Sequence, residues 1–317
     1  HISKEKYDEV VPKIIQEFTD VGPEKTIQFF MKPIDINKEY ADLKKDKVNI
    51  NDITAKKTGK SNKIIRKYMP HINEVEDHKG INIHSLWTKE NITDTFRRMD
   101  KPNYTVNSNF SEFLRWMKFN PVTIYSPIMT KSIINELECK TIFDPCIGWG
   151  GRMIGTTCLG DDYHYTGCEP FTKTFQGLES IVKDLDLNNQ VELYNQPVED
   201  VLEIIKDKTF DMCLTSPPYF DLEVYSHEET QSIKKYKTYE EWILNFLKPI
   251  IDYVCSNITK YSCWSVKNFK TEKEYNLLED VIRLHGENGW KLIEKYSIKK
   301  VTKDNSKDGD VTYVFKK

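Results

Sequence analysis

The spacing of hydrophobic and polar positions changes near residue 120. Before that point, apolar residues recur every three to four positions, a period that predicts amphipathic helices. The segments concerned are 7–18, 51–68, 83–99 and 110–117. After it, short apolar runs alternate with longer amphipathic stretches. The pattern predicts a mainly helical accessory region over residues 1–120 and a separate domain over residues 121–317.

Five apolar runs in the second region are each followed by a helical pattern. They are KTIFDP (140–145), YHYTGCEP (163–170), QVELYNQ (190–196), FDMCLTSPP (210–218) and YSCWSV (261–266). Five strand–helix units in succession predict an α/β fold with a doubly wound, mostly parallel sheet. Two terminal strand-like runs without a helix between them predict an added antiparallel hairpin. Functional residues are expected where the parallel strands end, just after residues 143, 168, 197, 215 and 266.

Bulk composition excludes several classes of protein. Of the 317 residues, 38% are hydrophobic and 30% charged, and no apolar run approaches the ~20 residues that cross a bilayer. The first residues carry no signal-peptide pattern, so we expect a cytoplasmic protein, or a nuclear one in a eukaryote, with no membrane partner. The seven cysteines include no CxxC pair, so we expect free thiols and no bound metal.

The net charge of −3 hides two basic segments. Residues 41–70 hold nine Lys and Arg against three Asp, and residues 291–317 hold eight Lys against four acids. A basic patch on a mildly acidic protein suits a polyanion partner, and a solvated lysine-rich surface is the alternative.

The first strand runs into DPCIGWGGR (144–152), a loop with three glycines. Glycines there permit a tight turn and the close approach of a ligand to the backbone. The loop has neither the dinucleotide spacing GxGxxG nor the Lys-Ser/Thr of a phosphate-binding loop. Because Asp144 at the strand tip repels phosphate, the loop suits a cationic ligand.

Carboxylates also follow the next two strands. Glu169 ends the second strand, where it suits the two hydroxyls of a ribose. Glu199 and Asp200 follow the third strand, where they suit the exocyclic amine of adenine. Each acid alone is more simply a helix cap, but three acids beside a glycine loop favour a ligand with a cation, a ribose and an adenine. That ligand is S-adenosylmethionine.

The fourth strand ends in TSPPYF (215–220), and here a family resemblance becomes specific. DPCIGWGGR, GCEP, PVEDV and TSPPYF, in this order, resemble motifs I to IV of the S-adenosylmethionine-dependent DNA amino-methyltransferases. YSPIMTKSIINEL (125–137) is similar to the family's motif X. The resemblance covers about residues 122–317 and implies a Rossmann-like class I methyltransferase fold. It also implies cofactor contacts from Asp144, Pro145, Gly148 and Gly150.

The same resemblance implies a mechanism at Ser216, Pro217, Pro218 and Tyr219. The Ser216 side chain and the Pro217 carbonyl would accept hydrogen bonds from the target amine, and the two prolines would hold them in place. Tyr219 would stack on the base, which must be flipped out of duplex DNA or be single-stranded. Phe220 extends this stacking surface or belongs to the core. Serine at the first position favours cytosine N4 over adenine N6.

Target recognition is expected from the N-terminal 120 residues, from the polar loop at residues 221–237, or from both. Residues 51–69 are spaced like a helix-turn-helix that is interrupted at Gly59, and a pair of amphipathic helices is the alternative. The basic residues expected to contact nucleic acid are Lys60, Lys63, Arg66 and Lys67. Two further functions stay open, an RNA base methyltransferase and an inactive nucleic-acid-binding subunit.

Overall fold

The computed structural model describes residues 4–30, 33–52, 62–99, 113–114, 117–119, 122–299 and 308–317. The chain divides into two compact units. One comprises residues 1–33 and 70–123, and the other comprises residues 34–69 and 124–317. The division after residue 123 lies close to the boundary expected at residue 120. Residues 34–69 group with the second unit, although the sequence pattern places them in the N-terminal region.

The first unit is mainly helical. Its elements are α1 (Lys4–Phe30), η2 (Pro70–Glu74), β1 (Glu76–Asp77), α5 (Ile83–Leu86) and α6 (Lys89–Met99). Its core includes Ile15, Trp87 and Ile92, and the Trp87 indole donates a 2.7 Å hydrogen bond to the carbonyl of Phe18. Helix α1 is longer than the predicted 7–18 and bends at Gly22, which has a φ of +78°. Within the described residues, no helix is long and apolar enough to span a membrane.

Residues 34–69 pack against the helices of the second unit. They form α2 (Ile36–Lys45), η1 (Ile50–Asp52) and α4 (Asn62–Tyr68). The buried Lys131 ammonium of α8 (Pro127–Leu137) donates to the carbonyls of Leu43, Lys44 and Asp46, which are orphan acceptors at the end of α2. Ile64 and Ile65 of α4 are fully buried. These apolar side chains account for the helical spacing of hydrophobic positions in this part of the sequence.

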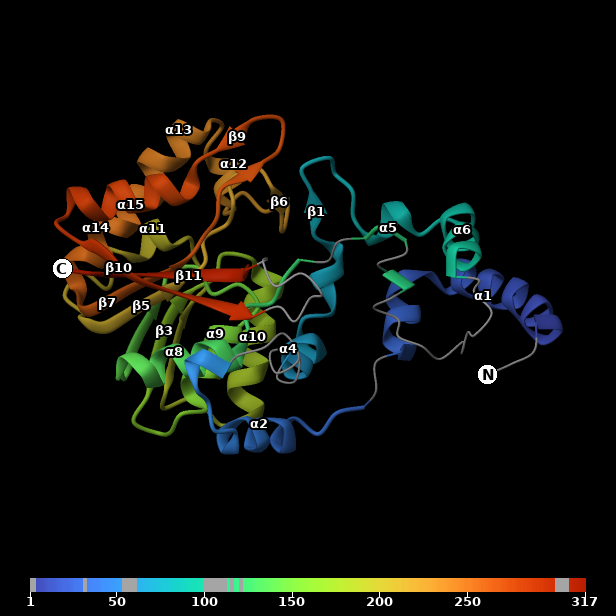
Figure 1. Ribbon diagram of the computed structural model, residues 1–317, viewed down its shortest axis with the longest axis horizontal. Helices are drawn as coiled ribbons and strands as arrows, with labels where there is room; N and C mark the ends of the chain where they lie inside the picture. Colours follow the sequence, from blue (N-terminus) through green and yellow to red (C-terminus); the bar gives the residue numbers. More distant parts are fainter. Residues whose placement is uncertain are drawn as a thin grey trace. The chain divides into compact units, whose positions relative to one another are not determined.

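The second unit is built on a seven-stranded sheet with the order β4-β3-β2-β5-β7-β11-β10 (Figure 1). The first five strands in this order are parallel, and β11 and β10 continue the sheet as an antiparallel pair. Their bounds are β2 (Thr141–Asp144), β3 (His164–Cys168), β4 (Val191–Tyr194), β5 (Phe210–Thr215), β7 (Ile258–Ser265), β10 (Lys291–Lys299) and β11 (Asp308–Lys316). The predicted fold class is therefore confirmed, hairpin included.

Helices cover both faces of this sheet (Figure 1). Helices α8, α9 (Gly151–Thr157) and α10 (Thr172–Asp184) lie on one face. Helices α11 (Val198–Val201), α14 (Lys248–Asn257) and α15 (Leu277–Glu287) lie on the other, over a core that includes Phe143, Trp264 and Phe315. Strands buried on both faces explain why the sequence shows continuous apolar runs instead of alternation.

Three local details differ from the expected elements. The helical pattern that follows QVELYNQ, over residues 198–206, forms only the four residues of α11. The helical pattern that follows FDMCLTSPP, over residues 239–258, is not one α-helix. It contains α13 (Tyr239–Trp242), a π-helical turn η3 (Ile243–Leu247) and then α14, because Pro249 lacks the N–H that would continue the α-helical ladder. A small hairpin of β8 (Phe269–Lys270) and β9 (Glu274–Tyr275) delays the start of α15.

Candidate active site

The carboxyl ends of β2, β3 and β5 meet at one edge of the sheet. Strand β2 pairs in parallel with β3 on one side and with β5 on the other, so the chain order reverses at β2. Doubly wound sheets bind ligands at such a switch point. The structure therefore brings the glycine loop after β2 together with Glu169 after β3 and Ser216 after β5.

The glycine loop takes a backbone path that glycine favours. Gly148 and Gly150 have φ values of +58° and +86°, in the left-handed region that costs energy for residues with a Cβ. Pro145 is buried at the start of the loop. Trp149 is buried too, and its ring lies 6.0 Å from the ring of Tyr225.

Asp144 has no exposed surface and forms the centre of a buried polar cluster. Its Oδ2 accepts hydrogen bonds from Arg152 Nε at 2.6 Å and from the Tyr165 hydroxyl at 2.5 Å. Its Oδ1 accepts from the Thr215 hydroxyl at 2.8 Å and from the Cys146 amide at 3.2 Å. The expectation that Asp144 faces a cationic ligand is not supported, because its charge is paired with Arg152 and its acceptor sites are filled by the protein.

Glu169 lies against the glycine loop. One carboxylate oxygen accepts from the Gly148 amide at 2.9 Å and the other from the Phe171 amide at 2.8 Å. The residue is 8% exposed. Burial raises its pKa to about 8, although the two backbone hydrogen bonds act to lower it. Glu169 therefore lies beside the glycine loop, and its contact with a ribose stays a prediction.

The two acids after β4 lie in different surroundings. Glu199 has a mostly buried side chain, and its Oε1 accepts from Lys235 Nζ at 2.7 Å and from the Tyr236 hydroxyl at 2.9 Å. Its Oε2 is buried and has no hydrogen-bond partner among the described residues. Asp200 is exposed and lies 3.8 Å from the Lys235 ammonium.

The Ser-Pro-Pro-Tyr segment follows the end of β5 and leads into a turn over residues 219–222. The Leu222 amide donates a 2.7 Å hydrogen bond to the Tyr219 carbonyl and closes the turn. The Asp221 carboxylate accepts from Thr271 and Tyr275 at 3.1–3.2 Å. Ser216 and Tyr219 are partly buried, and the Tyr219 ring lies 5.5 Å from the ring of Phe269.

Phe220 belongs to the core and not to a stacking surface. It is 7% exposed and packs against the rings of Tyr239, Trp242 and Tyr275. Its φ of +33° turns the chain sharply after Tyr219. The expected nucleic-acid contact at Phe220 is therefore wrong, because neighbouring aromatic side chains already enclose the ring.

The polar loop at residues 221–237 lies beside the same sheet edge. It contains β6 (Glu223–Val224) and α12 (Ser232–Lys235). Glu228 accepts from the Thr172 amide at 3.1 Å, and Lys235 and Tyr236 bind Glu199. Contacts with the chain after β3 and after β4 place this loop next to the predicted cofactor residues. Its ordering on a nucleic acid stays a prediction.

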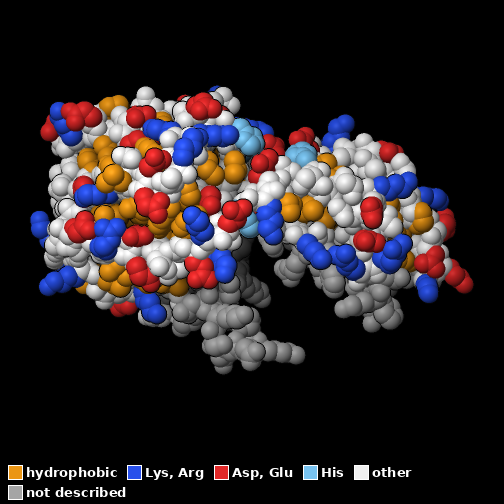
Figure 2. All heavy atoms as spheres, turned by 90° about the horizontal axis from the view of Figure 1, so that it is seen from above, with side chains coloured by type: hydrophobic (Ala, Val, Ile, Leu, Met, Phe, Trp, Pro, Cys, Tyr) orange, Lys and Arg blue, Asp and Glu red, His pale blue; other side chains and the backbone are white. Residues whose placement is uncertain are grey.

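The predicted basic contacts are partly described. Lys60 and Gly59 lie outside the described residues, so the helix-turn-helix expectation stays a prediction. Lys63, Arg66 and Lys67 are exposed on α4, and Lys63 pairs with Glu39 at 2.6 Å. On the face seen in Figure 2, basic and acidic side chains are interspersed. Contact between this helix and a nucleic acid stays a prediction.

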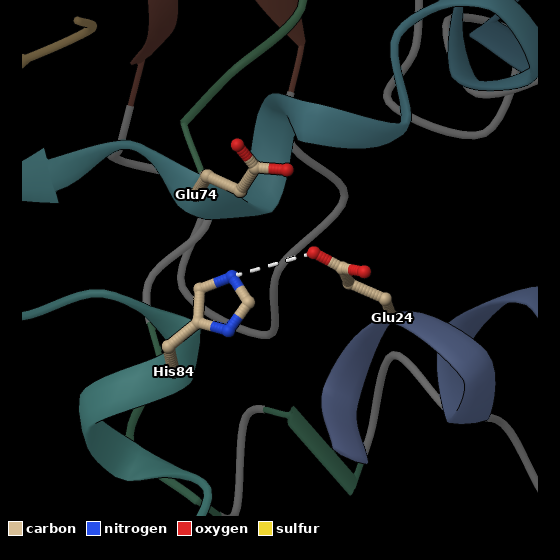
Figure 3. Close-up of side chains that lie close together, drawn as sticks. All are labelled: Glu24, Glu74 and His84. Atoms are coloured by element: carbon tan, nitrogen blue, oxygen red, sulfur yellow. Dashed lines mark ion pairs between the residues drawn. The ribbon is translucent and has the colours of Figure 1, made fainter. Parts of the chain in front are cut away.

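One group of side chains in the first unit has donor atoms that suit a cation. Glu24, Glu74 and His84 bring one ligand atom each within 4.8 Å of one another, and His84 Nε2 lies 3.9 Å from a Glu24 oxygen (Figure 3). Two of the three side chains are exposed. Exposed carboxylates often lie near a histidine without binding an ion, so we assign no metal chemistry to this group.

Sequence reasoning missed three members of the Asp144 cluster. Arg152, Tyr165 and Thr215 received no role, although all three are buried. A signal was present for Arg152, because it is the one charged residue in the segment GRMIGTT, which forms its helix. A charged side chain in such a helix requires a partner.

No family model matches the sequence, and no curated protein is significantly similar to it. Among solved structures, the chain resembles TrmN from Thermus thermophilus, with 10% identity over 61% of this chain and 49% of that chain and a TM-score of 0.41. It resembles a precorrin-6y C5,15-methyltransferase from Geobacter metallireducens, with 12% identity over 61% and 88% of the two chains and a TM-score of 0.42. It also resembles a SAM-dependent methyltransferase from Agrobacterium tumefaciens, with 10% identity over 62% and 63% and a TM-score of 0.44. The alignment spans about half the length of the first of these proteins, and likeness at this level assigns no activity.

Proposed function

We propose that this protein transfers a methyl group from S-adenosylmethionine to an exocyclic amino group of a nucleic-acid base. The target that we propose is DNA, with cytosine N4 preferred to adenine N6. One observation carries the proposal: the glycine loop and the Ser-Pro-Pro-Tyr segment follow adjacent parallel strands, β2 and β5, and Asp144 and Thr215 at the ends of these strands are hydrogen-bonded at 2.8 Å.

The side chains at this edge fit the cofactor. Glu169 presents a carboxyl group beside Gly148, where a Cβ would meet nothing within 4 Å and a ligand can approach the backbone. The buried Oε2 of Glu199, which has no hydrogen-bond partner in the described part of the chain, is an acceptor that suits the amine of adenine. When bound, S-adenosylmethionine supplies a methyl group that is activated by the positive charge on its sulfur.

The protein's own part in the reaction is to orient the target amine. An exocyclic amine is a weak nucleophile because its lone pair is delocalised into the ring. The Ser216 side chain and the Pro217 carbonyl would each accept one N–H, which aims the lone pair out of the plane of the base. Stiff prolines and the enclosed Phe220 hold these acceptors in place before the base arrives.

Tyr219 supplies the surface for an extruded base. Its ring is partly exposed, is packed on Phe269 from one side and lies 5.9 Å from the Lys267 ammonium. Stacking of a base on such a ring contributes roughly 1–3 kcal/mol. A base can reach it only when flipped out of the duplex or when single-stranded.

The decisive test offers labelled S-adenosylmethionine with duplex DNA, single-stranded DNA and RNA, followed by mass spectrometry of the nucleosides. N4-methylcytosine or N6-methyladenine in DNA supports the proposal. Methylated RNA bases alone would favour the RNA methyltransferase. Cofactor binding without transfer to any substrate would favour an inactive binding subunit.

A further inference from the structure

The buried Arg152 guanidinium makes three hydrogen bonds, one to the Asp144 carboxylate and two to carbonyls of the glycine loop after β2, called here the cofactor loop. Its Nε donates to Asp144, and its Nη2 donates to the carbonyls of Cys146 and of Ile147, the latter at 3.1 Å. The residue is 3% exposed, and its charged group lies 5.0 Å from the ring of Tyr125.

Helix preferences do not explain an arginine at this position. Arg152 is the second residue of α9, where the positive end of the helix dipole disfavours a cation. Burial acts to lower its pKa, but the Asp144 carboxylate and the Tyr165 hydroxyl hold the pKa above its ordinary value, so the guanidinium stays charged. A buried ion pair is also no general source of stability compared with apolar residues of similar size. The pair therefore calls for an explanation other than stability.

The hydrogen bonds of Arg152 hold two consecutive peptide groups of the cofactor loop. In a trans peptide, the C=O and the N–H point in opposite directions. The peptide joining residues 146 and 147 has its C=O on Arg152 and its N–H on the carbonyl of Cys168, at 3.0 Å. The next peptide has its C=O on Arg152 and its Gly148 N–H on the Glu169 carboxylate, at 2.9 Å. Two consecutive peptide planes are thus fixed from both sides.

We propose that Arg152 is a positioning residue that sets the two peptide planes of the cofactor loop and, through the Gly148 amide, the orientation of Glu169. The inference rests on the proposed function, because it takes Glu169 as the ribose contact. Arg152 does not touch the cofactor in this proposal. Asp144 neutralises the guanidinium, and its bond with Thr215 ties the same cluster to the strand that ends at Ser216.

The test compares cofactor affinity and stability in Arg152→Lys. Lysine keeps the positive charge but carries all its donors on one nitrogen, so it cannot reproduce the hydrogen bonds that Arg152 makes from two nitrogens. By calorimetry, we expect S-adenosylmethionine to bind about 10- to 100-fold more weakly, the range that follows from losing charged hydrogen bonds. In steady-state kinetics, the KM for S-adenosylmethionine should rise by a larger factor than kcat falls. The circular dichroism spectrum should remain that of the folded protein.

The matched control is His285→Gln, which alters another buried hydrogen-bonding side chain on the opposite face of the sheet. His285 bonds to Ser262 at 2.9 Å and to the Val281 carbonyl at 2.8 Å. This variant should melt at a lower temperature and bind the cofactor as the parent protein does. Parent-like affinity in Arg152→Lys would overturn the inference, whereas a parent protein that binds no S-adenosylmethionine would instead remove the proposed cofactor.

A second measurement needs no variant. In the parent protein without cofactor, the amide protons of Ile147 and Gly148 should exchange with solvent at least about 100-fold more slowly than in an unstructured chain, because each is held in a fixed hydrogen bond. Exchange at the unstructured rate would show that the loop is not held and would overturn the inference, even if Arg152→Lys failed to fold.

Discussion

The Thr215 hydroxyl donates a 2.8 Å hydrogen bond to Oδ1 of Asp144, and neither side chain is exposed to solvent. Thr215 is the last residue of β5, and the Ser-Pro-Pro-Tyr segment begins with the next residue. Asp144 is the last residue of β2, and the glycine loop follows it directly. The bond therefore joins the two chain segments between which a methyl group would have to pass, and it fixes their separation from inside the sheet.

Ser216→Ala should abolish transfer while leaving cofactor binding nearly unchanged, because in the proposed function the hydroxyl accepts a hydrogen bond from the target amine. We expect a loss of about 100-fold or more in kcat, of the size seen when one well-placed polar contact to a reacting group is removed. Ser180→Ala on the exposed face of α10 is the matched control and should behave like the parent. Calorimetry in which Ser216→Ala loses as much cofactor affinity as Glu169→Ala would contradict this division of roles.

Tyr219 and Phe220 are adjacent in sequence but should respond differently to alanine substitution. Tyr219→Ala should raise KM for the nucleic acid about 10- to 100-fold through lost stacking, and Tyr219→Phe should restore most of it. Phe220→Ala removes a buried ring and should lower the free energy of unfolding by about 3 kcal/mol or more. Denaturant titrations and steady-state kinetics separate the two effects. Equal stability losses for both alanine variants would mean that Tyr219 is a core residue.

The order of strands and helices in the second unit was predictable because parallel strands buried on both faces leave continuous apolar runs such as TIFD and FDMCLT. The grouping of residues 34–69 with the second unit was not predictable. A helical period reveals that Ile64 and Ile65 lie on an apolar helix face, but it does not reveal what that face packs against. The two-residue strands β8 and β9 are too short to leave a period at all.

At the site, sequence order located the strand ends but not the direction of each side chain. The acid at the tip of β2 was visible in the sequence. Its enclosure was not, because Arg152, Tyr165 and Thr215 reach it from a helix and two neighbouring strands. The partners of Asp144 therefore depend on how the sheet folds, and the position of the acid at a strand end does not reveal that its charge is paired.

Gly151→Ala should be strongly destabilising, because a Cβ at this position would lie 1.8 Å from the carbonyl oxygen of Tyr125. The clash is with backbone, so the chain before α8 would have to move, and we expect a loss of about 3 kcal/mol or more in the free energy of unfolding. Gly286→Ala is the matched control, since its Cβ would meet nothing within 4 Å in the helix α15. That variant should gain roughly 0.5–1 kcal/mol. Similar unfolding midpoints for the two variants would contradict the close approach of α9 to residue 125.

Glu169 should give the protein a pH-dependent stability of unusual sign. The pKa of its carboxyl group is about 8 in the folded protein and near the ordinary 4.5 in the unfolded chain. Between these values the folded protein holds a proton that the unfolded chain has released, so the free energy of unfolding falls as the pH rises through this window. The accumulated loss by pH 9 is on the order of 3–5 kcal/mol.

Denaturant titrations of the parent and of Glu169→Gln from pH 5 to pH 9 isolate this effect, because the other titrating groups cancel in the difference. The variant should be less stable at low pH, since an amide nitrogen cannot accept the Gly148 or Phe171 amide proton, but the gap should close as the pH rises. Saturating S-adenosylmethionine should make the free energy of unfolding of the parent protein depend less steeply on pH, because ribose hydroxyl donors favour the ionised carboxylate and lower its pKa. Parallel stability curves for the two proteins across this range would mean that Glu169 is ionised throughout and that its burial does not govern its charge.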